Sequence, residues 1–374
     1  MALCYAPFLH RMVETTGNYQ LCCVAKEYDD GKYNDWEGED YQKIRKHMIE
    51  EKELPDTCIT CKTKEEYNQY SFRHSFNQLY ERLGSPSLDI QYGTAWEVPI
   101  SFDLRMNNLC NLSCRMCGPS ASTQLVKEAE KYPELWPKWA DEAEDFKSNK
   151  FDVNYIIENA GAIGDLRLLG GEPSVQPEAK AILKELIRIG NTGIGLHITT
   201  NGTNSNKEFY DMISKFNRVL IVVSIDSWGK HHEYIRGPAA HFPTIWKNLN
   251  KLKSLPNNPK VMIQQTVTAL NIFDFWRLRK NNDSVCELMS NLATWPDKYS
   301  PINMPDRWKL RAIEIAKENN GYESNRHIFG QMMKKGNPDH LIGISKYTEL
   351  MDSVRGQRLI DYFPTTHEMF EDIG

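Results

Sequence analysis

The sequence predicts an α/β fold, a partial (β/α)6 barrel of the TIM type with a small N-terminal cysteine-rich module and a C-terminal helical extension. Short apolar runs alternate with amphipathic stretches through the middle of the chain. One run, Val219 to Val223, is five apolar residues long, which is typical of strands buried on both faces of a parallel sheet. The two ends differ, because residues 1–92 hold five of the nine cysteines and residues 296–374 hold none.

Six segments have the composition or the glycine-bounded apolar pattern of strands. They are 98–105, 165–171, 193–202, 218–227, 260–268 and a candidate sixth at 284–292. Residues 177–190 and 242–255 repeat apolar positions at helical spacing, and Gly190 is a natural helix end. Strand, helix and strand at this spacing predict right-handed βαβ units and a parallel sheet. The ligand site of such a barrel lies at the C-terminal ends of its strands.

We place domain boundaries near residues 93 and 296. They separate a module at 1–92, a barrel at 93–295 and a helical region at 296–374. The net charge of −5 gives no general attraction to nucleic acid. No apolar run approaches the roughly 18 residues of a membrane span, and the first residues lack the pattern of a secretory leader. We therefore expect a reducing cytoplasm, where clustered cysteines favour metal binding over disulfides.

Three cysteines lie close together in "LCNLSCRMCGP" (109–119), directly after the first predicted strand. Cys110, Cys114 and Cys117 have the spacing C-x3-C-x2-C. Thiolates are soft ligands for zinc or iron–sulfur clusters, and a structural zinc site needs four ligands. Three thiolates on one loop therefore favour a [4Fe–4S] cluster whose fourth iron stays open to another molecule.

This spacing resembles the signature of the radical S-adenosylmethionine (SAM) superfamily. The resemblance extends to "GGEP" (170–173), "VSIDS" and "YIRGP". It implies that Gly170, Gly171 and Glu172 face the ammonium of SAM. It also implies that Ser224 and Asp226 face the ribose or carboxylate, and that Arg236 grips the carboxylate. Thr200, Asn201 and Met116 are further cofactor candidates. The structural alternatives are a plain β–α turn, a polar strand end, a solvated arginine and a loop-packing methionine.

The superfamily implies that the reduced cluster cleaves SAM and that the 5′-deoxyadenosyl radical takes a hydrogen atom from a substrate. A flavodoxin or ferredoxin would supply the electron. The substrate stays open between a peptide and a nucleotide or sugar, and the sequence gives no catalytic acid, base or radical donor. A rival from another class is a non-catalytic, zinc-stabilised binding protein on the same scaffold.

The N-terminal cysteines form a second group. Cys4 and Cys22 flank Gly17 in the pattern C-x12-G-x4-C, and Cys58 and Cys61 follow in "CITC". A strand–turn–strand with Gly17 at its turn would bring two thiols together, and four thiolates complete a cluster. The pattern resembles the twitch or SPASM-like module that carries an auxiliary [4Fe–4S] cluster, although that module usually follows the barrel. A zinc site on the same four cysteines is the alternative, and Cys23 is an alternative to Cys22.

Overall fold

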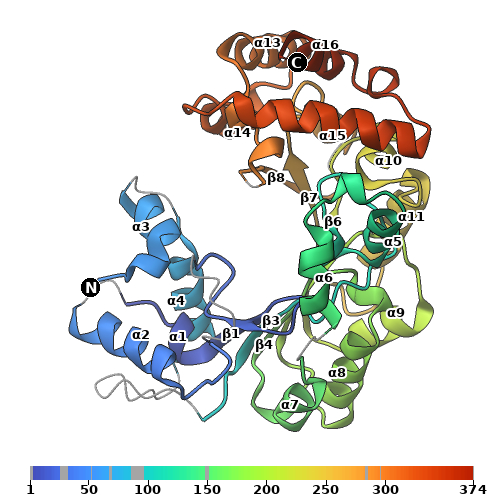
Figure 1. Ribbon diagram of the computed structural model, residues 1–374. Helices are drawn as coiled ribbons and strands as arrows, with labels where there is room; N and C mark the ends of the chain where they lie inside the picture. Colours follow the sequence, from blue (N-terminus) through green and yellow to red (C-terminus); the bar gives the residue numbers. More distant parts are fainter. Residues whose placement is uncertain are drawn as a thin grey trace. The chain divides into compact units, whose positions relative to one another are not determined.

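The fold is α/β, as predicted, in a computed structural model that describes residues 3–25, 33–51, 53–66, 70–85, 97–147, 151–282, 285–294 and 296–373 (Figure 1). The boundary expected near residue 93 lies outside these residues. The described strands are β1 (His10–Val13), β2 (Tyr19–Gln20), β3 (Ser101–Leu104), β4 (Asp165–Leu168), β5 (Gly195–Thr200), β6 (Arg218–Ser224), β7 (Lys260–Val267) and β8 (Glu287–Leu292).

Sixteen α-helices are described, and several begin at side chains that cap them. Ser122, Asp152 and Asn206 each accept a hydrogen bond from a backbone N–H in the first turn of the helix that follows. The helices are α1 (Ala6–Leu9), α2 (Glu39–Glu50), α3 (Ile59–Glu66), α4 (Phe72–Arg82), α5 (Thr123–Lys131), α6 (Trp139–Lys147), α7 (Val153–Glu158), α8 (Pro177–Arg188), α9 (Lys207–Ile213), α10 (Lys230–Arg236), α11 (Phe242–Lys253), α12 (Trp276–Asn282), α13 (Asp306–Glu318), α14 (Arg326–Met332), α15 (Asp339–Arg355) and α16 (Pro364–Ile373).

All six predicted strands are present, as β3 to β8, and the sheet has the order β2-β1-β3-β4-β5-β6-β7-β8. Strands β3, β4 and β5 pair in parallel, as do β7 and β8. The joining of two further, N-terminal strands to this sheet was not predicted. β1 pairs in parallel with β3, from His10 opposite Ser101 to Val13 opposite Leu104, and β2 pairs antiparallel with β1. The N-terminal segment therefore adds two strands to the sheet of the barrel.

The predicted strand–turn–strand around Gly17 is confirmed. β1 and β2 are its two strands, and Gly17 has a φ of 85°, which glycine adopts without a steric penalty. The helices predicted at 177–190 and 242–255 are also confirmed, as α8 and α11. In α8 the apolar positions Ala179, Ile182, Leu183 and Leu186 are all buried.

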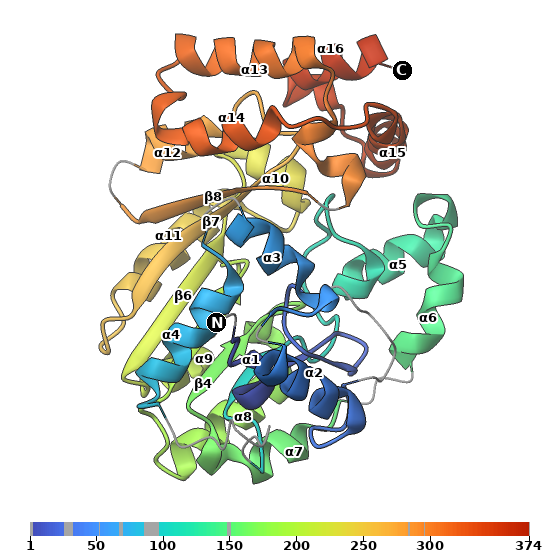
Figure 2. The same cartoon turned by 90° about the vertical axis from the view of Figure 1, so that its left-hand side faces the viewer.

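The chain divides into two compact units. The first comprises Met1–Leu109, Asp141–Ile198 and Asn206–Leu220; the second comprises Cys110–Ala140, Thr199–Ser205 and Ile221–Gly374. Within the first unit, helices α1 to α4 lie together around the start of the chain (Figures 1 and 2). Their apolar side chains, among them Phe8, Tyr41, Cys61 and Phe76, form one core that also includes Cys4.

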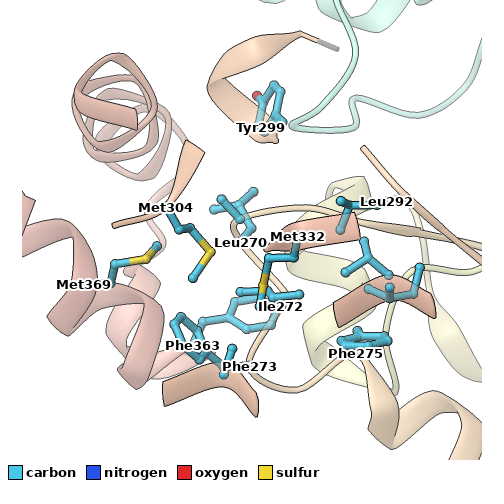
Figure 3. Close-up of a cluster of buried hydrophobic side chains, with 14 of the residues drawn as sticks. Leu270, Ile272, Phe273, Phe275, Leu292, Tyr299, Met304, Met332, Phe363 and Met369 are labelled. Carbon is cyan, nitrogen blue, oxygen red and sulfur yellow. The ribbon is translucent and has the colours of Figure 1, made fainter. Parts of the chain in front are cut away.

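The second unit has a core that joins the end of the barrel to the C-terminal helices. In Figure 3, Leu270, Phe273 and Phe275 from the loop after β7 converge with Met304, Met332 and other side chains of the C-terminal region. Helices α13 to α16 lie together in both views of the chain. Residues 296–373 are largely helical, as predicted, and within this unit they share a core with residues of β7, β8 and the loops that follow them.

Candidate functional site

Four of the predicted site segments begin at or just after the carboxyl end of a strand. The cysteine loop follows β3, "GGEP" follows β4, Thr200 and Asn201 end β5, and Ser224 to Asp226 end β6. In the second unit, Cys110 and Cys114 are buried and Cys117 is half-buried. Thr123 Oγ1 donates to the Cys110 carbonyl at 3.0 Å, and Cys117 N donates to the Cys114 carbonyl at 3.1 Å. These bonds fold the loop back on itself.

The thiols of this loop interact with one another. A hydrogen bond with Cys117 lowers the pKa of Cys114, and the same bond, together with burial, raises the pKa of Cys117. The charge of the Arg236 guanidinium lowers the pKa of Cys117, and that of Cys110 raises it. Three thiols on one loop are a ligand set that fits three irons of an iron–sulfur cluster. The described residues hold no group of three or more His, Cys, Asp or Glu side chains converging on a single metal ion. A cluster binds each thiolate at a different iron, so its ligands do not converge in that way.

Arg236 is held beside these thiols by Asp226. Its Nε lies 2.6 Å from Asp226 Oδ2, and Thr266 N donates to Oδ1 of the same carboxylate at 3.0 Å. Burial alone would lower the pKa of Arg236, but the charges of Asp226 and Cys114 raise it by more than burial lowers it. The guanidinium therefore stays cationic. Asp226 has no exposed surface, and both its oxygens accept hydrogen bonds from the protein. Ser224 ends β6 and is half-buried.

Asn201 joins the end of β5 to the cysteine loop. Its Nδ2 donates to Asn111 Oδ1 at 2.9 Å and lies 4.0 Å from Cys110 Sγ. Thr203 donates to Asn201 Oδ1 through both its N–H and its hydroxyl. Thr200 is buried, and its hydroxyl accepts from Gly202 N at 3.1 Å. The structure thus brings Asn201 to the thiol of Cys110.

Arg115 and Met116 are the two residues between Cys114 and Cys117. Met116 is half-buried and packs against the core of the second unit, which is the arrangement expected for a loop-packing methionine. Arg115 was missed. It is 1% exposed and forms an ion pair with Asp352. Its position between Cys114 and Cys117 was a signal in the sequence, but nothing local could identify its partner.

In the first unit, the "GGEP" turn packs on the residues that lead into the cysteine loop. Gly171 has a φ of 51°, and a Cβ there would come within 2.4 Å of the Leu109 carbonyl oxygen. Gly170 has a φ of 62° and would meet Arg105 in the same way. Glu172 N donates to the Leu109 carbonyl at 2.9 Å. Its carboxylate is 1% exposed and accepts from the N–H and hydroxyl of Ser174.

The four predicted N-terminal cysteines lie around one cavity in the first unit. Cys4, Cys22, Cys58 and Cys61 line one small cavity together with apolar side chains and Arg73. Burial raises the pKa of Cys4 and Cys22 well above the usual thiol range, and the charges of other cavity cysteines add to the effect. Arg73 forms a bidentate ion pair with Glu65.

Cys23 does not line that cavity. Burial and the charge of Asp103 raise its pKa to about 11, against the opposing charges of Arg105 and Arg167. Of these two adjacent cysteines, Cys22 is the one that lines the cavity with Cys4, Cys58 and Cys61. Cys286 is separate from both groups, and its thiol donates to the Val261 carbonyl at 2.8 Å.

The part of the chain that matches a known protein family covers strands β4 to β7 and the helices between them. Residues 104–267 match the sequence model of the radical SAM superfamily. The sporulation killing factor maturation protein SkfB of Bacillus subtilis (strain 168) is 26% identical over 211 residues, which is 56% of this chain and 45% of SkfB. The chain thus spans less than half the length of this curated relative. No helix in the described parts of the chain is long and apolar enough to cross a membrane.

Two solved structures are similar at low identity. Native anSMEcpe with bound AdoMet is 16% identical with a TM-score of 0.36, and the match covers 68% of this chain and 61% of that one. Streptococcus suis SuiB bound to S-adenosylmethionine is 14% identical with a TM-score of 0.38, and the match covers 69% of this chain and 55% of that one.

Proposed function

From the radical SAM superfamily domain at residues 104–267, we propose that this protein is a radical SAM enzyme that modifies a peptide. The observation that carries the proposal is the loop of Cys110, Cys114 and Cys117, whose thiols are buried or half-buried and whose backbone is folded by hydrogen bonds to the carbonyls of Cys110 and Cys114. A bound [4Fe–4S] cluster with SAM would supply reductive cleavage of the sulfonium and a carbon-centred radical that takes a hydrogen atom from the substrate.

The residues of the chain would bind the cluster and SAM and orient them. Cys110, Cys114 and Cys117 are the cluster ligands. Arg236 binds the carboxylate of SAM, because a guanidinium pairs well with a carboxylate and Asp226 fixes its direction. Asp226 is therefore a positioning residue. Asn201 supports the cluster through its contact with Cys110.

The remaining candidates are assigned by their motifs. Gly170, Gly171 and Glu172 would contact the ammonium of SAM. Ser224 and Thr200 would contact its ribose, and Met116 would contact its adenine. The buried contacts of Glu172 with Ser174 support a role of the carboxylate in holding the turn as well.

A second [4Fe–4S] cluster would bind at Cys4, Cys22, Cys58 and Cys61. The support is the single cavity that all four line and the cation of Arg73 beside it. The four thiolates would fill every iron, so this cluster would transfer electrons or stabilise the fold. Residues 1–92 would then be a twitch-like module, 93–295 the core barrel and 296–374 a helical region. A zinc ion on the same four thiolates is the competing occupant.

The relative SkfB favours a peptide over a nucleotide or sugar, because its name describes the maturation of a killing factor. A flavodoxin or ferredoxin would deliver the electron in a reducing cytoplasm.

The test uses the full chain, purified and reconstituted without oxygen. We expect a brown protein whose electron paramagnetic resonance (EPR) signal after reduction changes when SAM is added, and which forms 5′-deoxyadenosine with dithionite. A colourless protein that holds zinc and leaves SAM intact would instead establish the non-catalytic binding protein. A precursor peptide encoded beside the gene, changed in mass by the reaction, would identify the substrate class.

A further inference from the structure

Arg115, which lies between the second and third cysteines of the loop, is held by several partners within the second unit. Its Nη2 donates to Asp352 Oδ1 at 2.5 Å and to Gln357 Oε1 at 2.8 Å, and its Nε donates to the Tyr234 carbonyl at 2.9 Å. The guanidinium also lies 3.7 Å from the centre of the Tyr234 ring. A cation that is 1% exposed needs such partners, because an unpaired buried charge is strongly unfavourable.

The backbone of Arg115 and of Ser113 is also held by residues that are distant in sequence but lie in the same unit. Arg115 N donates to the Ile235 carbonyl at 2.8 Å, and the Tyr299 hydroxyl donates to the Arg115 carbonyl. Arg355 donates to the Ser113 carbonyl at 2.8 Å and pairs with Glu128 Oε2 at 2.7 Å. Both residues that flank Cys114 are therefore fixed by side chains or backbone from far along the chain.

Asp352 collects these contacts on one carboxylate. Besides Arg115, the Tyr234 hydroxyl donates to its Oδ1 at 2.8 Å, and Leu359 N donates to its Oδ2 at 2.6 Å. Helix α15 ends at Arg355, and the next residue, Gly356, has a φ of 62° that turns the chain back so that Gln357 and Leu359 reach the Arg115–Asp352 pair. The end of α15 and the turn after it thus form one hydrogen-bonded unit with the cysteine loop.

We infer that the end of α15 and the following turn, residues 352–359, position the cysteine loop for its cluster, with Asp352 as the central positioning residue. This inference rests on the proposed function. The segment from Cys114 to Cys117 has a single backbone hydrogen bond of its own, from Cys117 N to the Cys114 carbonyl. Ordering such a loop costs conformational entropy, so the contacts that offset this cost come from elsewhere in the chain. The helical region 296–374 is in this way part of the cofactor site.

The test compares Asp352→Asn with Asp361→Asn in the full chain. The first substitution keeps the size of the side chain and removes the charge that Arg115 needs. Asp361 is the matched control, because it belongs to the same region but forms an exposed pair with Arg358. Gln357→Met is a milder variant, which removes one acceptor of Arg115 and leaves the ion pair.

Two measurements are made on each variant whose circular dichroism matches the unmodified protein. In the apo protein, the rate of alkylation is mapped by mass spectrometry, with Cys286 as the internal reference. After reconstitution, the iron content and the SAM-dependent change in the EPR signal are measured. We expect Cys114 and Cys117 to react at least threefold faster in Asp352→Asn and the SAM-dependent signal to fall by half or more. Gln357→Met should show smaller changes in the same direction, and Asp361→Asn none.

Unchanged alkylation of Cys114 and Cys117 in both Asp352→Asn and Gln357→Met would overturn the inference. If Asp352→Asn does not fold, Gln357→Met alone decides. The alkylation needs no cluster, so it separates this inference from the proposed function. An unmodified protein that never binds iron or responds to SAM would refute the function, whereas the alkylation rates would still report whether residues 352–359 hold the loop.

Discussion

The guanidinium Nε of Arg236 lies 2.6 Å from Oδ2 of Asp226, a carboxylate with no exposed surface. The pair lies beside the thiols of Cys114 and Cys117. Asp226 therefore fixes a cation next to the candidate cluster ligands. Thr266 N donates a hydrogen bond to the Asp226 carboxylate, and the backbone N–H of Asp226 donates to His232 Nδ1.

Replacing Asp226 by Ala should be strongly destabilising. The change leaves the guanidinium of Arg236 buried without its partner and removes the acceptor of Thr266 N. Breaking a buried ion pair in this way costs about 3–5 kcal/mol. Urea unfolding measures it, and SAM affinity should fall in the same variant. Asp211→Ala is the control, since its exposed pair with Lys207 should contribute less than about 1 kcal/mol. Equal losses in the two variants would contradict the role of Asp226.

The two adjacent cysteines of the N-terminal module should behave differently. Cys22 lines the cavity with the other three cysteines and Cys23 does not. We expect Cys22→Ser to lose about four irons per chain after reconstitution, one [4Fe–4S] cluster, and Cys23→Ser to keep them. Iron and zinc analysis of both variants decides the occupant, because a loss of one zinc from Cys22→Ser would identify a zinc site.

Removing the loop cysteines should not change the iron bound at the proposed N-terminal site. In a Cys110→Ala, Cys114→Ala, Cys117→Ala variant we expect about four irons to remain and the SAM-dependent EPR change to vanish. The two sites are independent ligand sets, since no cysteine belongs to both. Residual iron near zero would mean that the N-terminal cysteines hold zinc or nothing.

A methyl group at Gly171 should disturb the turn and the entry to the cysteine loop. The residue has a φ of 51°, and its Cβ would come within 2.4 Å of the Leu109 carbonyl oxygen. A non-glycine residue in this conformation costs about 1–3 kcal/mol before the clash is counted. Thermal unfolding of Gly171→Ala should therefore show a lower midpoint than that of Gly161→Ala, because a Cβ at Gly161 meets no atom within 4 Å. The same midpoint for both would show that the turn accommodates the methyl group.

Two buried histidines should make stability depend on pH. Burial lowers the pKa of His10 and of His232 to about 3. An unfolded histidine titrates near 6.5, so between pH 6.5 and 3 the unfolded chain binds more protons than the folded one. The free energy of unfolding should therefore decrease as the pH falls through this window, by up to about 1.4 kcal/mol per pH unit for each histidine.

Urea unfolding at several pH values measures this slope. His232→Asn should reduce this slope by the contribution of one histidine, whereas substitution of the exposed His241 by Asn should leave the slope unchanged. A slope in His232→Asn equal to that of the unmodified protein would show that His232 does not remain neutral in the folded state.

Local patterns in the sequence determined much of the fold and of the candidate sites. Runs such as Val219 to Val223 identified β6, helical spacing identified α8 and α11, and Gly17 identified the turn between β1 and β2. Cysteine spacing identified Cys110, Cys114 and Cys117 and the four N-terminal cysteines that the structure gathers around one cavity. These signals were readable because backbone preference and ligand spacing act over a few residues.

Only the tertiary structure decided which distant segments meet. The four residues of β1 join the sheet because they pair with β3, about 90 residues away, and no local period encodes that register. Asp352 reaches Arg115 across 237 positions of the chain. Such a partner depends on how packed elements bring two side chains together after folding, and a sequence pattern reports only the side of an element on which each side chain lies.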